Sequence, residues 1–334
     1  MNIGFRVDSS NKIGTGHVNR CITLAKSFKK KGIKNYFISR IDKGNINKKI
    51  IKEGFELKKI SNRKHDINKD AEKTKLFIKK YKIDLILIDN YLINLLWEKQ
   101  ISKLCKIIFL DDCLKRKTIC DYYINYHNLK SKNKDNKFFL NKKCKRFLGP
   151  KFSIVKTIPL KKKLRINKKK IFVFMGGVDN KNITSKIISI LKSKEFSNYK
   201  INIMIGQRNL RKKIIIKMVK KLKNFSTDIG RFDNLYNFFN EANLSIVNAG
   251  VTMYENLTFG REVLVIPQSN THRKILSNYS GSNLINYVES ISKLKKKHII
   301  NLIKKKPNKN LIKLRKKIFD SKGSIRLTEY FSSL

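Results

Sequence analysis

The chain has 334 residues, 41% of them apolar, which is enough for two packed domains. It contains no apolar run of 18 or more residues, so no transmembrane helix is expected, and its start lacks the pattern of a signal peptide. The five cysteines form no CxxC pair, which favours free thiols in a reducing cytoplasm over a disulfide framework or a zinc site. They are Cys21, Cys105, Cys113, Cys120 and Cys144.

The charge balance is strongly basic, with 77 Lys and Arg against 24 Asp and Glu and a formal net charge of +53. Such a balance is typical of nucleic-acid binding, but the lysines are spread along the whole chain and no RNP-like or helix-turn-helix motif occurs. We therefore expect solvated lysines and no nucleic-acid partner, and keep a basic polyanion-binding protein as the less favoured alternative. The positive field attracts dianionic ligands such as a nucleoside diphosphate.

Strand-like and helix-like segments alternate over the first 150 residues. Short apolar runs predict strands at Ile3–Val7, Asn35–Ser39, Glu56–Lys59, Asp84–Ile88, Ile107–Leu110 and Tyr122–Asn125. Apolar residues at helical spacing predict helices at His17–Lys31, Lys69–Lys80 and Ile93–Lys103. This alternation predicts an α/β domain with a parallel sheet and helices on both faces.

The alternation stops at residues 151–169, where Pro159 and the basic run 161–165 predict a linker, and then it restarts. Strands are expected at Ile171–Met175, Ile201–Ile205, Thr227–Ile229, Leu244–Val247 and Val263–Ile266. Helices are expected at Asn182–Ser193, Leu210–Lys223, Asp233–Asn240 and Thr252–Phe259.

The expected fold class is therefore α/β, with two Rossmann-like domains facing across a cleft. An N-terminal domain over 1–150 carries the loop of residues 14–20, a linker covers 151–169, and a second domain over 170–290 binds a nucleotide. A basic helical tail is expected over 291–334. Ligands of such sheets lie at the carboxyl ends of the strands, so the motifs of interest follow strands.

The first motif, Gly14-Thr15-Gly16-His17-Val18-Asn19-Arg20, follows the first strand and opens a helix. The unpaired N–H groups and the dipole of a helix N-terminus favour an anion, so a phosphate is expected near Gly14, Thr15 and Gly16. The loop is not GxGxxG, so the dinucleotide fingerprint is absent. Histidine suits a general base near neutrality, which makes His17 the catalytic candidate; a helix cap or a buried ring is the alternative.

Two further small-residue turns lie in the second half. Met175-Gly176-Gly177-Val178-Asp179 follows a strand, and Asn248-Ala249-Gly250 opens a helix that carries Glu255. Glycines let the backbone approach a phosphate, and the helix expected after Gly176-Gly177 directs its dipole at that phosphate. A carboxylate accepts hydrogen bonds from a ribose diol. Ordinary strand-to-helix turns and a solvated Glu are the alternatives, but together these features favour a nucleotide held by the second domain.

Weaker signals follow other strands. Asp89 and Tyr91 are candidates for binding a sugar ring, and Asn125, His127 and Asn128 are candidates for lining the cleft. The pair Asp111-Asp112 has no third ligand at a readable spacing, so loop capping is favoured over a metal site. No metal or cofactor is expected, and no HExxH, GxSxG, Walker A or kinase motif occurs.

The order of these motifs resembles the UDP-2,4-diacetamido-2,4,6-trideoxy-β-L-altropyranose hydrolases of pseudaminic acid biosynthesis, over roughly residues 2–290. The matching segments are Phe5–Ser10, Gly14–Arg20, Ile88–Tyr91, Leu110–Asp112, Leu148–Phe152, Met175–Asp179 and Asn248–Gly250 with Glu255. The resemblance implies the glycosyltransferase-B fold and a relationship to the glycosyltransferase that makes lipid II from UDP-N-acetylglucosamine.

The resemblance further implies a cytoplasmic, metal-independent and inverting hydrolysis at C1 that releases UDP and the free sugar, in a pathway leading to flagellin glycosylation. It places the base that activates water at His17 and the ribose contact at Glu255. Lys156 stands where family members often carry Arg, and keeps the charge without the bidentate fork. The full set of expected substrate contacts is Asp8, Gly14, Thr15, Gly16, Asp89, Tyr91, Asn128, Lys156, Gly176, Gly177, Asn248, Ala249, Gly250 and Glu255. A UDP-sugar-dependent glycosyltransferase, in which an acceptor replaces water, is the alternative. The exact sugar, the oligomeric state and the role of the tail are not predicted.

Overall fold

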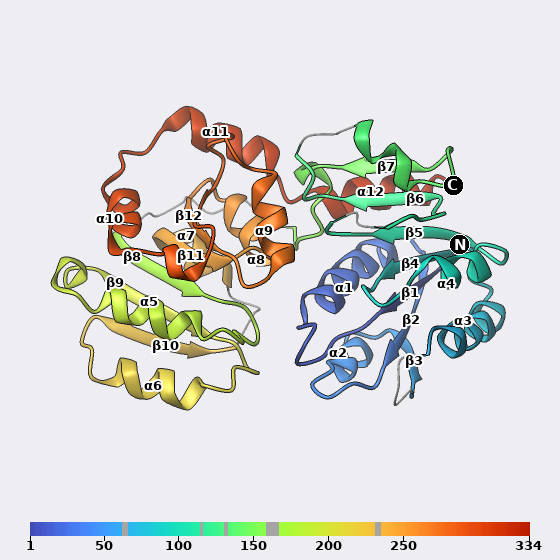
Figure 1. Cartoon of the computed structure of the whole chain (residues 1–334), viewed down its shortest axis with the longest axis horizontal. Helices are drawn as coiled ribbons and strands as arrows, with labels where there is room; N and C mark the ends of the chain where they lie inside the picture. Colours follow the sequence, from blue (N-terminus) through green and yellow to red (C-terminus); the bar gives the residue numbers. More distant parts are fainter. Residues whose placement is uncertain (62–65, 114–115, 130–132, 158–166, 231–234) are drawn as a thin grey trace. The chain divides into compact units, whose positions relative to one another are not determined.

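The computed structural model describes residues 1–61, 66–113, 116–129, 133–157, 167–230 and 235–334. They form two compact units: residues 1–156 with 322–334 make unit 1, and residues 157–321 make unit 2 (Figure 1). Each unit contains one parallel sheet with helices packed against it. The predicted fold class, an α/β protein with two Rossmann-like domains, is confirmed.

The sheet of unit 1 has seven strands in the order β3-β2-β1-β4-β5-β6-β7. Every neighbouring pair is parallel. The strands are β1 (Asn2–Val7), β2 (Lys34–Arg40), β3 (Glu56–Ile60), β4 (Leu85–Asp89), β5 (Lys106–Leu110), β6 (Tyr122–Asn125) and β7 (Lys145–Leu148). The chain runs outward from β1 in one direction and from β4 in the other, so the topological switch point lies between these two central strands. The edge strand β7 was not predicted, because its first two residues are charged and exposed.

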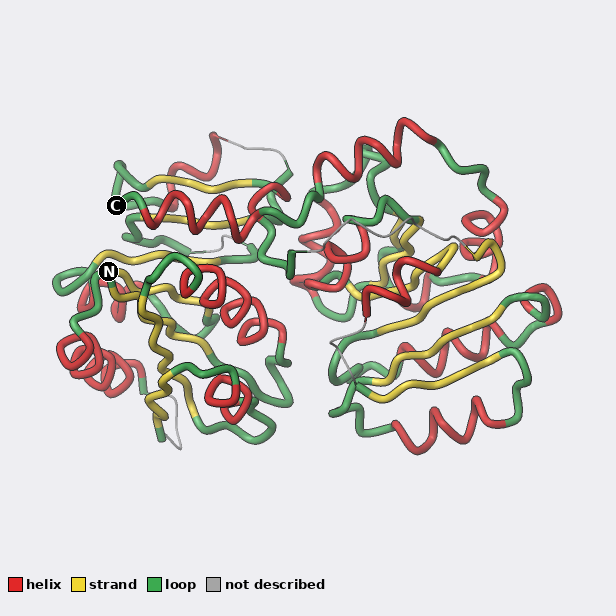
Figure 2. The backbone as a smooth tube through the Cα atoms, turned by 180° about the vertical axis from the view of Figure 1, so that it is seen from behind, coloured by secondary structure: helices red, strands yellow, loops and turns green. Residues whose placement is uncertain are grey.

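Helices cover both faces of this sheet (Figure 2). They are α1 (Gly16–Lys29), α2 (Asn47–Lys52), α3 (Ile67–Tyr81), α4 (Leu95–Ile101) and α12 (Gly323–Ser332), with 3₁₀ turns η1 (Asn133–Phe138) and η2 (Pro150–Phe152). On one face, α3 and α4 form a core around the fully buried Trp97. On the other, the Phe5 ring of β1 packs near Phe28 of α1, which meets Phe331 of α12 edge to face. Alternate strand residues supply the two cores.

The sheet of unit 2 has six parallel strands in the order β10-β9-β8-β11-β12-β13. They are β8 (Asn167–Phe174), β9 (Lys200–Ile205), β10 (Phe225–Ile229), β11 (Ala242–Asn248), β12 (Glu262–Ile266) and β13 (Asn286–Tyr287). Counted within the unit, the order is 3-2-1-4-5-6, which is the Rossmann order, with its switch point between β8 and β11.

The helices of unit 2 are α5 (Ile183–Leu191), α6 (Lys212–Lys220), α7 (Leu235–Glu241), α8 (Val251–Leu257), α9 (Asn270–Ser277), α10 (Lys296–Lys304) and α11 (Lys309–Ile318), with 3₁₀ turns η3 (Lys194–Phe196) and η5 (Ile291–Lys293). Ile171 and Val173 of β8 face the core that includes α5. Phe172 and Phe174 alternate with them and face a smaller core with Phe239 of α7. In neither unit is any described helix long and apolar enough to cross a membrane.

The predicted tail over 291–334 is helical, but it is not a separate extension. Residues up to 321 belong to unit 2, where the fully buried Arg315 of α11 donates from Nε to the Leu284 carbonyl at 2.7 Å and pairs with Glu262. Helix α12 belongs to unit 1, where the Thr328 hydroxyl bonds Ser27 of α1 at 2.8 Å. Because the segment is rich in lysine, its sequence did not indicate which side chains pack inside the two units.

The predicted linker over 151–169 is shorter in the structure. Ser153, Ile154 and Val155 are buried in unit 1, which extends to Lys156. Strand β8 begins at Asn167, before the predicted start of the second domain. Residues 158–166, in the middle of the predicted linker, lie outside the described residues.

Candidate active site

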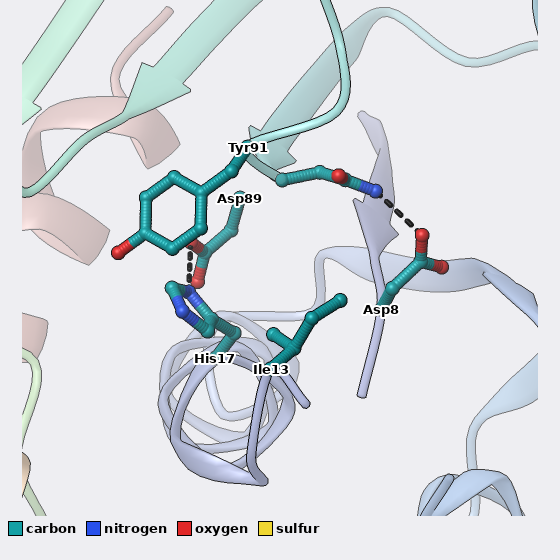
Figure 3. Close-up of a pocket in the computed structure, with 6 residues that line it drawn as sticks. Asp8, Ile13, His17, Asp89 and Tyr91 are labelled. Carbon is teal, nitrogen blue, oxygen red and sulfur yellow. Dashed lines mark hydrogen bonds and ion pairs between the residues drawn. The ribbon is translucent and has the colours of Figure 1, made fainter. Parts of the chain in front are cut away.

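The switch point of unit 1 brings together two residues that are far apart in the sequence. Strands β1 and β4 are paired with Val7 opposite Asp89, so the α1 helix that follows β1 begins beside the end of β4. The His17 Nδ1 atom lies 2.7 Å from the Asp89 Oδ1 atom (Figure 3). Both side chains line a small pocket, together with Asp8, Ile13, Asn90 and Tyr91.

The contacts of His17 determine which ring nitrogen carries the proton. Its Nδ1 atom is 2.7 Å from the Asp89 carboxylate and 3.0 Å from the Arg20 guanidinium. The ionised Asp89 carboxylate can only accept. The Arg20 nitrogen donates to Asp89 at 2.6 Å and has a second N–H, but the contact of Nδ1 with the carboxylate is the shorter of its two contacts. A protonated Nδ1 therefore satisfies the carboxylate best and leaves the lone pair on Nε2. The ring is only partly buried, and Tyr91 packs edge to face on it at 4.9 Å between ring centroids.

Arg20 is the buried centre of this site, one helical turn after His17. Its guanidinium donates twice to Asp89 at 2.6 Å, to Asp112 at 2.6 Å and to the Tyr126 hydroxyl at 2.8 Å. Burial alone would raise the pKa of Asp89, but the charge of Arg20 and the hydrogen bonds from Arg20 and His17 outweigh it and lower that pKa to about 2. The Asp89 carboxylate is therefore ionised throughout the physiological range.

Asp112 ties the outer side chains of the site to Arg20. Its carboxylate accepts from the Tyr91 hydroxyl and contacts the His127 Nε2 atom at 2.9 Å. Burial opposes ionisation of Asp112, yet Arg20 and His127 hold the pKa of that carboxyl well below its usual range. Burial also lowers the pKa of the His127 ring despite its contact with Asp112, so this second histidine is neutral at physiological pH.

The pair Asp111-Asp112 is not organised as a metal site. Asp111 accepts a hydrogen bond from the Cys113 amide at 3.2 Å, as a loop cap does, and another from the Tyr123 hydroxyl. Burial, together with the charge of Asp112, raises the pKa of Asp111 to about 6. Within the ranges that the structure describes, His, Cys, Asp and Glu side chains form no group of three or more that could hold a metal ion.

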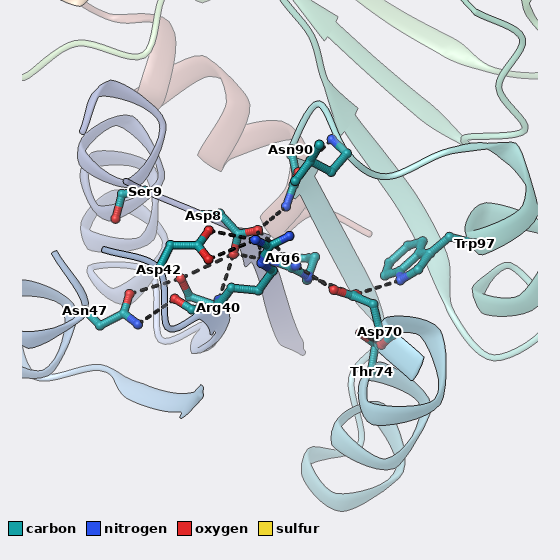
Figure 4. Close-up of polar contacts among 12 residues, drawn as sticks. Arg6, Asp8, Ser9, Arg40, Asp42, Asn47, Asp70, Thr74, Asn90 and Trp97 are labelled. Carbon is teal, nitrogen blue, oxygen red and sulfur yellow. Dashed lines mark hydrogen bonds and ion pairs between the residues drawn. The ribbon is translucent and has the colours of Figure 1, made fainter. Parts of the chain in front are cut away.

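Asp8 lines the pocket, but its carboxylate is engaged by neighbours. Arg6 binds it through two nitrogens at 2.6 and 3.0 Å and also pairs with Asp70 (Figure 4). The Arg40 amide and the Asn90 side chain donate to the same carboxylate at 2.8 and 2.6 Å. Asp8 thus fixes the β1–α1 loop and the orientation of Asn90, and its expected contact with substrate stays a prediction.

The loop of residues 14–16 leaves room for an anion. Gly14 has φ +85°, which favours glycine, and its amide already donates to the Ser10 carbonyl at 2.8 Å. Thr15 is the N-cap of α1 and makes no side-chain capping bond. A Cβ added at Gly16 would meet nothing within 4 Å. The amides that remain for an anion are those of the first turn, from Gly16 onward, because they have no partner within the helix.

At the switch point of unit 2, the predicted small residues meet. Gly176 follows β8 with φ +83°, and a Cβ there would lie 2.8 Å from the Asn248 side-chain nitrogen at the end of β11. A Cβ at Gly250 would lie 3.5 Å from the Asn248 side-chain oxygen, and one at Gly206 would lie 2.3 Å from the Gly177 carbonyl. Glycine is therefore required at position 206, where a Cβ would meet backbone, and it is favoured at position 176 by the φ of +83°, whereas the 3.5 Å distance at Gly250 is an ordinary contact.

One expectation for this turn needs correction. The helix after Gly176-Gly177 was expected to direct its dipole at a phosphate, but Asp179 occupies its N-terminus. The Asp179 carboxylate accepts from the amides of Ile183 and Thr184, each at 2.9 Å. The N-terminus of α5 is thus capped by the protein itself.

The structure gives the positions of the remaining predicted residues but does not test their roles. Glu255 lies partly buried in α8, where its charge adds to burial in raising the pKa of Tyr236. Ala249 is buried between β11 and α8. Asn128 is partly buried after β6, and Lys156 is exposed at the end of unit 1. Sequence reasoning gave no role to Arg20, which lies one turn into α1, and considered Asp112 only as half of a metal pair. It named His127 only as a residue that could line the cleft.

Comparison with known proteins gives two similar curated sequences, while no family model matches the chain. An uncharacterized protein of Methanocaldococcus jannaschii is 29% identical over 291 residues, covering 84% of this chain. The chain spans only 58% of the length of that relative. The UDP-2,4-diacetamido-2,4,6-trideoxy-β-L-altropyranose hydrolase of Campylobacter jejuni is 30% identical over 261 residues, covering 77% of this chain and 88% of the relative.

Solved structures share the fold over nearly the whole chain. MurG of Acinetobacter baumannii has a TM-score of 0.68 at 13% identity. The match covers 100% of this chain and 100% of MurG. The calicheamicin glycosyltransferase CalG4 has a TM-score of 0.67 at 9% identity, with 99% of this chain and 97% of that chain covered. These likenesses show the glycosyltransferase-B fold. With the sequence similarity, they show that the chain belongs to the family of the UDP-2,4-diacetamido-2,4,6-trideoxy-β-L-altropyranose hydrolase.

Proposed function

We propose that the chain is a nucleotide-sugar enzyme that hydrolyses a UDP-linked diacetamido-trideoxy sugar at C1, releasing UDP and the free sugar for pseudaminic acid biosynthesis in the cytoplasm. The observation that carries the proposal is the 2.7 Å contact between His17 and the buried, ionised Asp89 in a pocket at the switch point of unit 1. Membership of the hydrolase family supports the substrate class.

In the proposed reaction, His17 takes a proton from water while the water attacks C1. Asp89 holds the Nδ1–H group, so that Nε2 receives the proton, and its negative charge stabilises the ring when that proton arrives. Arg20 keeps Asp89 ionised and fixed through two hydrogen bonds of 2.6 Å. The role of Arg20 is therefore positioning, because its guanidinium faces carboxylates rather than the pocket.

The leaving group is UDP, for which we propose the switch point of unit 2 as the binding site. Glycines 176, 177 and 250 let the backbone approach a diphosphate, and Glu255 accepts hydrogen bonds from the ribose. Backbone N–H groups stabilise the charge that develops on the departing phosphate. Because a diphosphate leaves without a strong general acid, the second carboxylate of ordinary glycosidases is not needed, and attack opposite UDP inverts C1.

The proposal is tested by incubating the chain with candidate UDP-sugars in ¹⁸O-labelled water. NMR and mass spectrometry would follow UDP release, the anomer first formed, and the position of the label. We expect an inverted sugar with the label on C1 and none in UDP; label in UDP would contradict cleavage of the C1–oxygen bond. His17→Asn should lower kcat by roughly 10²–10⁴ and leave UDP affinity unchanged. Near-normal turnover of this variant would remove His17 from the base role.

A glycosyltransferase is the second candidate, because the structural neighbours include glycosyltransferases. Release of free sugar without an acceptor favours the hydrolase, whereas turnover that requires an acceptor favours the transferase. The net charge of +53 keeps polyanion binding as a third candidate. UDP binding without oligonucleotide binding at moderate salt would eliminate it, since electrostatic binding of nucleic acid falls steeply with salt.

A further inference from the structure

We propose that Cys120 and Cys144 are an oxidation site that forms a reversible disulfide, outside the pocket described above. Cys120 lies just before β6 and Cys144 just before β7, and the two strands are parallel neighbours with Tyr122 opposite Lys145. The two Sγ atoms are 3.6 Å apart. A disulfide bond is about 2.05 Å long, so the sulfurs need to approach by only roughly 1.5 Å.

The backbone around the two cysteines is already held in place. Before Cys144, the Leu140 amide donates to the Thr118 carbonyl at 2.8 Å, and after it the Lys145 amide donates to the Asp121 carbonyl at 2.9 Å. The Thr118 amide in turn donates to the Phe138 carbonyl at 2.9 Å. Bond formation therefore requires small side-chain adjustments rather than a rearrangement of the strands.

The two thiols differ in a way that assigns their roles. Cys144 is partly exposed and Cys120 is fully buried. The contact with Cys144, together with burial, raises the pKa of the Cys120 thiol, which keeps it protonated and unreactive toward an external oxidant. Oxidation thus begins at Cys144, and Cys120 resolves the product.

With hydrogen peroxide as the two-electron oxidant, the Cys144 thiol loses its proton to solvent, and the thiolate attacks one oxygen, so that the O–O bond breaks and a sulfenic acid and hydroxide result. The hydroxide takes up a proton equivalent to the one that the thiol released and becomes water. The Cys120 sulfur then attacks the Cys144 sulfur, the S–S bond forms, and the hydroxyl group leaves with the Cys120 proton as water. Two thiols and one hydrogen peroxide become one disulfide and two waters. A dithiol such as dithiothreitol reverses the reaction.

The disulfide would tie the edge strand β7 to β6 and close the loop of residues 120–144. A cross-link of this length constrains the unfolded chain, so the melting temperature of the oxidised protein should rise by roughly 5–10 °C. The loop carries Tyr126, which accepts a hydrogen bond from Arg20, and His127, which contacts Asp112, whereas His17 and Asp89 lie outside the cross-linked segment. This inference is independent of the proposed function.

The experiment uses the full chain, reduced and then treated with a small excess of hydrogen peroxide. Titration of thiols after denaturation should fall from five to three, and peptide mapping without reductant should find Cys120 joined to Cys144. Dithiothreitol should restore five thiols and the lower melting temperature. Five remaining thiols, or a disulfide with a different partner, would overturn the proposal.

Variants separate this pair from general thiol oxidation. Cys144→Ser changes a partly exposed side chain, so it is expected to fold, and it should abolish both the disulfide and the rise in melting temperature. Cys113→Ser is the matched control, because Cys113 is likewise partly exposed, and it should leave both intact. Equal loss in the two variants would refute the specific pairing.

Discussion

Replacing Asp89 with Asn tests the central feature of the site. The substitution keeps the shape of the side chain but removes the charge that holds the His17 Nδ1–H group and pairs with Arg20. An amide can also present its NH₂ group to Nδ1, which favours the wrong tautomer and moves the lone pair away from the pocket. In other enzymes, the same change in an aspartate–histidine pair lowers turnover by about 10⁴.

The structure also sets the expected loss of stability. The pKa of Asp89 is lowered from 3.8 to about 2, and each pKa unit corresponds to about 1.4 kcal/mol, so the ionised carboxylate contributes about 2 kcal/mol at neutral pH. Because the folded-state pKa is depressed, this contribution is fully present above about pH 4. It disappears as the pH falls through about 2. The stability difference between wild type and Asp89→Asn should therefore shrink with acidification.

The assay measures kcat and KM with the UDP-sugar, UDP affinity by calorimetry, and urea unfolding at several pH values. We expect Asp89→Asn to lower kcat by roughly 10²–10⁴ with unchanged UDP affinity. Asp66→Asn is the matched control, because Asp66 is a surface N-cap of α3 and Asn caps equally well. Near-normal turnover of Asp89→Asn would refute the proposed pairing of Asp89 with His17.

Three further substitutions separate positioning, nucleotide binding and folding. Arg20→Lys keeps the charge but loses the paired hydrogen bonds to Asp89, so kcat should fall more than KM changes, and the melting temperature should drop; unchanged kcat would contradict a positioning role. In Gly176→Ala, the added Cβ would lie against the Asn248 side chain, on a backbone with φ +83°. This variant should lose about 1–3 kcal/mol in the free energy of unfolding and bind UDP more weakly in calorimetry. Asp179→Ala removes the cap of α5 and should lower the free energy of unfolding in urea by about 1–2 kcal/mol. Loss of UDP binding without loss of stability would instead mean that Asp179 contacts the nucleotide.

The fold was predictable from the sequence because most strands are short apolar runs and most helices have apolar residues at helical spacing. Elements with mixed composition were missed. Strand β7, at the sheet edge, begins with two exposed charged residues, and α2 has only two buried positions in six. The division of the C-terminal segment was not predictable either, since the contacts of Thr328 and Arg315 are with residues far away in the sequence.

The site was predictable in part, and the missing part has a physical cause. The strand-end rule identified His17 and Asp89 separately, and the structure places them in contact. Arg20 was overlooked because an arginine side chain is usually exposed, yet here it is 4% exposed and bonded to the carboxylates of Asp89 and Asp112. Asp179 was assigned to a phosphate turn, whereas its carboxylate caps α5, because the sequence does not show where a side chain points.

The two switch points have different chemistry although their strand order is the same. In unit 1, the strand ends carry buried ionised groups around Arg20, and such groups keep their charge only while each has a partner. In unit 2, two glycines at the strand ends, Gly176 and Gly206, lie so close to other atoms that a Cβ would clash. In the proposed reaction, the first arrangement positions the base and the second binds the diphosphate. Attack of water on a sugar linked to a diphosphate needs a base as well as a site that binds the diphosphate. The proposed reaction therefore accounts for the different residues at the two switch points.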